Sequence, residues 1–113
     1  MSVRELIREI QSSASRDNYT PGEGADDVRK LSSLLGNVHG EVRRTETAYK
    51  RVLLTAYQQE KTSNRAKLLA ETSPEYLAWR EAVDLGKELI ELTRSLKAFV
   101  RNAEDERKYS GSM

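Results

Sequence analysis

Cysteine is absent from the 113 residues, and proline occurs only twice. Without cysteine, the chain forms no disulfide and offers no thiolate to a metal or a substrate. Only 37% of the residues are hydrophobic and 6% are aromatic, whereas 33% are charged. A thick globular core is hard to build from this composition, and a thin arrangement of long helices is easier.

Long apolar runs are also missing. No segment approaches the roughly 20 consecutive apolar residues that a membrane span needs. The first residues, Met1 to Ile10, mix Arg and Glu with apolar side chains, unlike the continuous apolar stretch of a signal peptide. We therefore expect a cytoplasmic protein without a membrane partner.

Residues suited to catalysis are scarce. His39 is the only histidine, and there is no cysteine or second histidine to join it in a metal site. The segment Gly22-Glu23-Gly24 lacks the helix and the lysine that accompany a phosphate-binding loop. We predict that the chain is not an enzyme and uses no cofactor, metal or small-molecule substrate. His39 is then a surface or packing residue.

The start of the chain has the pattern of a short helix. Ser2 and Glu5 form the S-x-x-E signature of a capped N-terminus. One apolar stripe follows, made of Val3, Leu6, Ile7 and Ile10. The sequence predicts a helix over residues 3–14 and, because turn-forming residues follow without periodicity, a loop over 15–25.

A long amphipathic helix is predicted over residues 26–62. With Val28 at position a of a heptad, positions a and d carry Val28, Leu31, Leu35, Val38, Val42, Thr45, Tyr49, Val52 and Ala56. Gly36 and Gly40 lie inside this seam, and a break of the helix there is the alternative. We predict a continuous helix because the seam resumes after the glycines without a change of phase.

A second long helix is predicted over residues 74–108, followed by a tail, 109–113. Ser73 and Pro74 have the residue types preferred at the cap and at the first position of a helix. The seam of this helix comprises Ala82, Leu85, Leu89, Leu92, Leu96, Phe99 and Ala103. Residues 63–73 form the corner between the two long helices and contain a helical turn or two.

These elements predict a single all-α domain, residues 1–113. The two long helices form an antiparallel hairpin with coiled-coil character, and the short helix packs beside them. A hairpin this thin leaves apolar residues beside the seams uncovered, among them Leu53, Leu54, Val83 and Ile90. We therefore expect the chain to form a homo-oligomer.

Basic residues are sorted onto particular helix faces, although the net charge is only +1. In the last helix every heptad position f, opposite the seam, is basic, and in the middle helix two adjacent columns contain no acid. Either face is an ordinary solvated surface or a track for phosphates, and both interpretations stay open. The candidate nucleic-acid-binding residues are Arg43, Arg44, Lys50, Arg51, Arg80, Lys87, Arg94, Arg101 and Lys108.

Aromatic side chains divide into two groups. Tyr19, Tyr57 and Tyr109 lie off the seams and are candidates for stacking on bases. The others fall on the seams and are predicted to be in the core: Tyr49, Tyr76, Trp79 and Phe99.

Residues 48–110 resemble small helical proteins that tailed phages encode beside their recombination genes. The resemblance lies in the Ala-Tyr pairs Ala48-Tyr49 and Ala56-Tyr57, a charged Arg65-Ala66-Lys67-Leu68 corner and a final leucine-rich helix from Leu92 to Arg101. It is similar in kind to the recombination mediators of T-even phages. The resemblance implies an oligomeric accessory of strand annealing or exchange, located in the cytoplasm of a bacterial host.

Together these observations favour a non-enzymatic phage protein that assists DNA recombination. Its partners would be single-stranded DNA, a single-strand-binding protein or a recombinase. Two alternatives stay open, namely a protein-interaction module such as an inhibitor of a host defence or nuclease, and a virion assembly factor.

Overall fold

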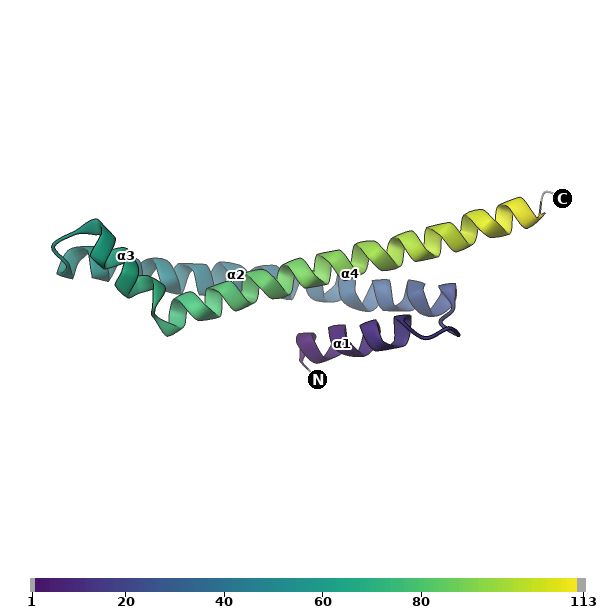
Figure 1. Cartoon of the computed structure of the whole chain (residues 1–113), viewed down its shortest axis with the longest axis horizontal. Coiled ribbons are helices and arrows are strands. Elements are labelled where there is room, and N and C mark those ends of the chain that lie inside the picture. Colours follow the sequence, from purple (N-terminus) through teal and green to yellow (C-terminus); the bar gives the residue numbers. More distant parts are fainter. Residues whose placement is uncertain (1, 112–113) are drawn as a thin grey trace. The chain divides into compact units, whose positions relative to one another are not determined.

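The computed structural model describes the backbone of residues 2–111 and the side chains of residues 2–108. Its elements are α1 (Val3–Ala14), α2 (Pro21–Gln59), α3 (Ser63–Glu71) and α4 (Pro74–Gly111), as Figure 1 shows. Within the described residues no strand occurs. The predicted all-α fold, with two long antiparallel helices and a short N-terminal helix, is confirmed.

The contacts divide the chain into two units, each containing part of both long helices. The first unit comprises the described residues up to Gly36 and those from Lys87 onward, and the second comprises residues 37–86. In each unit the segments of α2 and α4 run antiparallel and pack against each other. The first unit adds α1 to this pair, and the second adds α3.

Helix α1 has the predicted bounds, but α2 begins earlier than predicted. The Ser2 hydroxyl accepts a hydrogen bond from the Glu5 amide at 3.1 Å, as the capping pattern requires. Helix α2 begins at Pro21, so the loop predicted over 15–25 ends at Thr20. The Thr20 hydroxyl accepts from the Glu23 amide at 3.1 Å and donates to the Glu23 carboxylate at 3.1 Å.

Threonine and serine caps also determine the other helix ends. Helix α2 ends at Gln59 instead of residue 62, because Thr62 is extended and caps α3 by accepting from the Arg65 amide at 3.2 Å. The predicted corner, 63–73, therefore holds a helix of nine residues. Helix α4 starts at Pro74 as predicted and continues to Gly111. Residues 112 and 113 of the predicted tail lie outside the described residues.

In the first unit, α1 closes one side of the α2–α4 pair. Leu31 of α2 and Leu89 of α4 are fully buried, and Ile7 of α1 is buried with them. Arg4 of α1 also pairs with Glu88 of α4 at 3.9 Å. The predicted seam is correct here except at Phe99, which is 37% exposed. The Phe99 ring lies against Gly24, near the start of α2, and its centre is 5.5 Å from that of the Tyr19 ring.

In the second unit, small residues and one aromatic cluster form the core. Ala66 and Ala70 of α3 are fully buried. Tyr49 is buried, which confirms its predicted core role, and its ring is stacked 5.2 Å from the ring of the half-buried Trp79. Thr45, the one polar residue of the seam, is buried, and its hydroxyl donates to the Glu41 carbonyl of its own helix at 2.8 Å.

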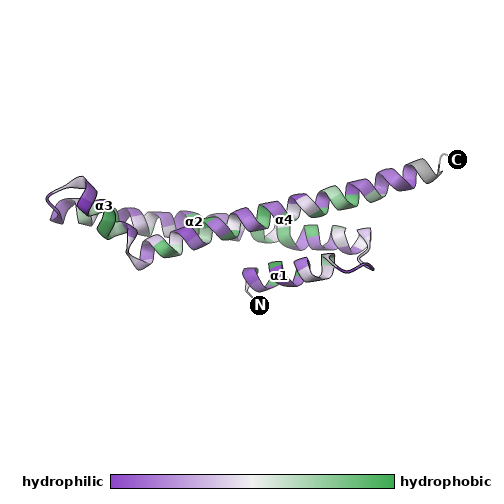
Figure 2. Cartoon of the chain, viewed as in Figure 1, coloured by the Kyte–Doolittle hydropathy of each residue, from purple (hydrophilic) through white to green (hydrophobic). Residues whose placement is uncertain are grey.

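Hydrophilic residues interrupt the apolar ones along every described helix, as Figure 2 shows. None of the helices in the described part of the chain combines the length and the apolar character needed to cross a membrane.

The predicted continuity of the middle helix is confirmed. Residues 36 and 40 are helical, and no glycine in the described residues has a positive φ. A Cβ added at Gly36 or Gly40 would meet no atom within 4 Å beyond its own neighbours. Neither position therefore needs glycine for its backbone angles or for packing.

Replacing both glycines with alanine should stabilise the protein. Each glycine costs roughly 1 kcal/mol relative to alanine inside a helix, so Gly36→Ala with Gly40→Ala should add up to about 2 kcal/mol to the free energy of unfolding. Urea denaturation monitored by circular dichroism measures this change in the free energy of unfolding. Gly24→Ala is the control and should gain less, because its Cβ would lie 3.1 Å from Val100 Cγ2. A destabilised double variant would contradict the prediction.

Candidate functional site

The predicted basic column of α4 is mostly exposed. Lys87, Arg94, Arg101 and Lys108 are exposed in the first unit, whereas Arg80 of the second unit is half-buried. The Arg80 guanidinium carbon lies 5.8 Å from the centre of the Trp79 ring, so this cation is already engaged by an aromatic face. The four cations of the first unit are the part of the column that is open to a ligand.

The basic set of α2 lies in the second unit and is partly neutralised. Arg43, Arg44, Lys50 and Arg51 are all exposed. Arg44 forms an ion pair with Glu41, and its hydrogen bond lowers the pKa of the Glu41 carboxyl. Lys50 pairs with Glu46 at 2.8 Å. Half of this set therefore has carboxylate partners on its own helix, as the solvated-face interpretation proposes.

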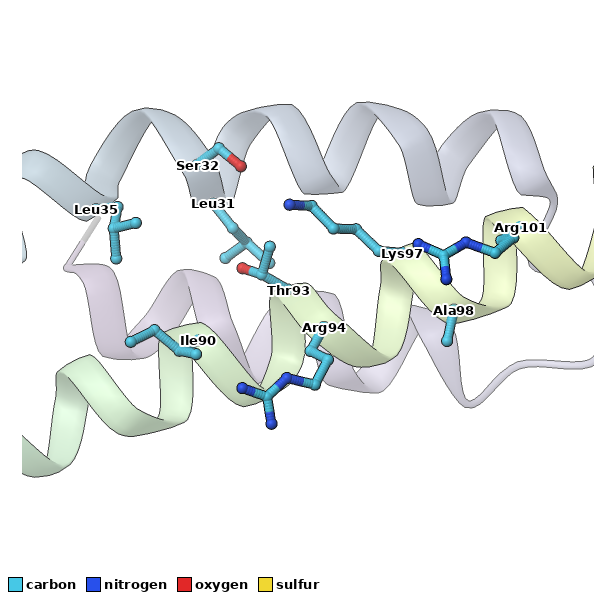
Figure 3. Close-up of a pocket in the computed structure, with 9 residues that line it drawn as sticks. All are labelled: Leu31, Ser32, Leu35, Ile90, Thr93, Arg94, Lys97, Ala98 and Arg101. Atoms are coloured by element: carbon cyan, nitrogen blue, oxygen red, sulfur yellow. The ribbon is translucent and has the colours of Figure 1, made fainter.

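A groove runs between α2 and α4 in the first unit and has a volume of about 430 Å³. We call it the α2–α4 groove. Helix α2 contributes Leu31, Ser32 and Leu35, and helix α4 contributes Ile90, Thr93, Arg94, Lys97, Ala98 and Arg101. Figure 3 shows Lys97 extending from α4 toward α2 and Arg101 directed into the space between the two helices.

The position of Arg94 and Arg101 corrects one expectation from the sequence. Position f was expected to face directly away from the seam, but both side chains line the groove beside it. The groove extends around this part of α4, so the long side chains of Arg94 and Arg101 border it although their heptad position lies opposite the seam.

The groove is strongly cationic. Arg94, Lys97 and Arg101 line it, and no acidic residue does. Among the side chains of residues 2–108, none of these three cations has a carboxylate oxygen within 4 Å. Lys97 was missed by the sequence argument because it does not belong to the seven-residue column. A pattern of i, i+3 and i+7 from Arg94 would have found it.

Two of the three tyrosines proposed for base stacking do not support that role. The prediction for Tyr19 is wrong, because this residue is only 9% exposed and its ring packs against Phe99. The Tyr109 side chain lies outside the described residues. Tyr57 is 40% exposed but belongs to the second unit. The α2–α4 groove itself has no aromatic lining residue.

Metal-ligating groups are not gathered in the structure as far as it is described. No group of three or more His, Asp or Glu side chains among these residues is placed to hold a metal ion. His39 is exposed on α2. The α2–α4 groove instead offers positive charge over an apolar floor, which suits binding of an anionic partner.

Comparison with known proteins found no matching family model, no matching curated protein and no matching solved structure.

Tyr19 should make the stability of the protein depend on pH in alkaline solution. Its hydroxyl donates to the Asp27 carboxylate at 2.7 Å. Burial first, and then the hydrogen bond and the negative charge of Asp27, raise the pKa of Tyr19 above its ordinary value of 10.0. The stabilisation is thus fully present below pH 10 and is lost as the pH rises further, because the unfolded chain releases this proton first.

Tyr19→Phe should therefore lower the free energy of unfolding by about 1 kcal/mol at neutral pH. Above pH 10, the wild type should lose stability faster than this variant. Denaturant titrations at several pH values measure both effects. Tyr57→Phe, which removes an exposed tyrosine, is the matched control and should follow the wild type. Parallel pH profiles for wild type and Tyr19→Phe would contradict the prediction.

Proposed function

We propose that this chain is a non-enzymatic accessory protein that assists DNA recombination by binding single-stranded DNA, or the complex of that DNA with its coating protein, through α4. The observation that carries the proposal is the set of exposed cations in the first unit. Lys87, Arg94, Lys97 and Arg101 project from one helix, and no described carboxylate lies within 4 Å of any of them.

Phosphates are the natural partner of such a surface. Unpaired, exposed cations bind a polyanion with little loss of existing interactions, and the release of condensed counterions adds to the affinity. Successive members of the seven-residue column lie about 10 Å apart along the helix. Since the groove has no aromatic lining residue, this binding would be insensitive to base sequence. The resemblance of residues 48–110 to phage recombination accessories points to single-stranded DNA in particular.

Removing three cations of α4 should lower the affinity for single-stranded DNA and make that affinity less dependent on salt. For single strands the slope of log affinity against log salt is about −0.7 per phosphate neutralised. The variant Lys87→Gln, Arg94→Gln, Arg101→Gln should reduce the magnitude of this slope by about 2. Fluorescence anisotropy with poly-dT and with a mixed-sequence oligonucleotide measures this slope, which should fall by the same amount for both oligonucleotides.

A variant of equal charge tests whether position matters. Arg8→Gln, Lys61→Gln and Lys67→Gln remove three exposed cations outside the proposed surface. This control should keep the slope of the wild type. Equal losses in the two variants would show only a response to net charge, and a wild type without salt-dependent binding at low ionic strength would rule out direct DNA contact.

We also propose that the chain self-associates. Large apolar side chains on the surface suggest a partner or a second copy, and the three most exposed leucines all lie in the second unit: Leu54, Leu68 and Leu77, at 59%, 65% and 59% exposure. Exposing them to water is unfavourable. A second copy would cover them and would leave the cations of the first unit free for an anionic partner.

Light scattering at micromolar concentration tests self-association. The wild type should have at least twice the mass of one chain, which is 12.9 kDa. Replacing Leu54, Leu68 and Leu77 with serine should shift the population toward the monomer without loss of helix content, because these side chains are not in the core. A wild type that is monomeric under these conditions would refute the proposal.

A further inference from the structure

The α2–α4 groove carries a feature that phosphate binding does not use, namely an apolar floor. Leu31 is fully buried at its base, and Ile90 is 40% exposed at its side. Leu35 and Ala98 extend the apolar lining. A sugar-phosphate backbone gains little from aliphatic surface, and bases lack an aromatic ring to stack on here. A partner with aliphatic side chains of its own would bury this surface.

The groove continues along the helix pair toward the start of α2. A second hollow shares Lys97 and Arg101 with the first and adds Ala25, Val28 and Val100. Together the hollows span residues 25–35 of α2 and 90–104 of α4. These stretches are about 15 and 21 Å long at 1.5 Å per residue, which matches three to four turns of a helix. The length and the apolar floor suit an amphipathic helix laid in a groove.

Helix α1 shows how such a helix packs on the same pair. It lies on the other side of α2 and α4, where it places Ile7 and Ile10 in the core. Its neighbours there include Asp27 and Lys30 of α2 and Glu88 of α4, none of which lines the groove. In Figure 3 the ribbon of α1 passes behind the groove. In the first unit, the α2–α4 pair is thus covered on one side and open on the other.

The charge of the groove selects among amphipathic helices. Arg94, Lys97 and Arg101 flank the apolar floor, and Glu104 at the far end is the one acid among the residues that line the two hollows. A helix with basic flanks, or a second copy presenting its own cations, would be repelled. A helix with glutamate or aspartate on both sides of its apolar stripe would pair with these cations while its stripe covers Ile90 and Leu35.

We infer that the α2–α4 groove binds an acidic amphipathic helix of a partner protein, in the place opposite α1. The inference uses Arg94 and Arg101, which are also assigned to phosphate contact in the proposed function, but it stands on the apolar floor and does not require DNA binding. Because the two ligands share these cations, the acidic helix and single-stranded DNA exclude each other from the first unit.

A synthetic peptide tests the inference on the full-length protein. The probe is a fluorescein-labelled, alanine-based helix with leucine at i, i+4, i+7 and i+11 and glutamate on both sides of that stripe. It should bind with an affinity that falls as salt rises. Two matched peptides separate the contributions, one with every glutamate replaced by glutamine and one with every leucine replaced by alanine. Each should bind at least about tenfold more weakly than the probe.

Protein variants locate the binding. Ile90→Ser and, separately, Ala98→Glu should each weaken the probe about tenfold, the first by removing an apolar contact and the second by adding a negative charge. Ala98 is exposed, so this second variant keeps the test valid if Ile90→Ser unfolds. Leu69→Ser is the matched control, because Leu69 is 49% exposed in the second unit. It should bind like the wild type.

The possible results separate this inference from the proposed function. Probe binding that responds to the groove variants supports the inference even if single-stranded DNA does not bind. DNA binding without probe binding overturns the inference and leaves the proposed function intact. If the glutamine peptide binds as tightly as the glutamate probe, the groove does not select an acidic helix, and the inference is wrong. Loss of self-association in Ile90→Ser, with no probe binding to the wild type, identifies a second copy as the occupant and also overturns the inference.

Discussion

Two helices packed side by side bury one seam and leave apolar residues exposed on either side of it, and this constraint governs both units. In the first unit α1 covers one side of the pair, where Ile7 and Ile10 are buried. In the second, α3 supplies Ala66 and Ala70, both fully buried. Among the described residues each unit has only one such covering helix, so apolar surface remains at the α2–α4 groove and at the exposed leucines of the second unit.

The charged residues of α2 and α4 differ in whether they have partners of opposite charge. Several acids and bases on α2 pair within the helix, as at Glu41 with Arg44, which partly neutralises that surface. On α4 the cations that line the groove have no such partner among the described side chains. Positive charge beside uncovered apolar surface is suited both to phosphates and to acidic helices. If both proposed ligands bind, they compete for Arg94 and Arg101, and an acidic helix would displace the DNA.

Much of the fold could be predicted from local signals, and the errors also have local causes. The seams identified Leu31 and Leu89 as core positions, and Ser2 marked the start of α1. The late start predicted for α2 came from treating Pro21 and the glycines after it as loop, although Thr20 and Glu23 form the same capping pattern as Ser2 and Glu5. For Tyr19 no local signal exists, since its burial depends on Phe99, which is distant in sequence.

The sequence by itself determined that two long helices and one short helix form and which face of each is apolar, because these properties follow from spacings of three and four residues and from caps. The seam favoured a helix that continues through Gly36 and Gly40, but a break stayed open, and the structure decided it. Only the tertiary structure decided which side of the α2–α4 pair is covered and which cations border the open side. That choice depends on the docking of α1 against the α2–α4 pair, through contacts between residues far apart in the chain, such as Arg4 and Glu88. The sequence spacing places Lys97 near Arg94 and Arg101 on α4, but only the tertiary structure places these cations beside Leu31 and Leu35 of α2.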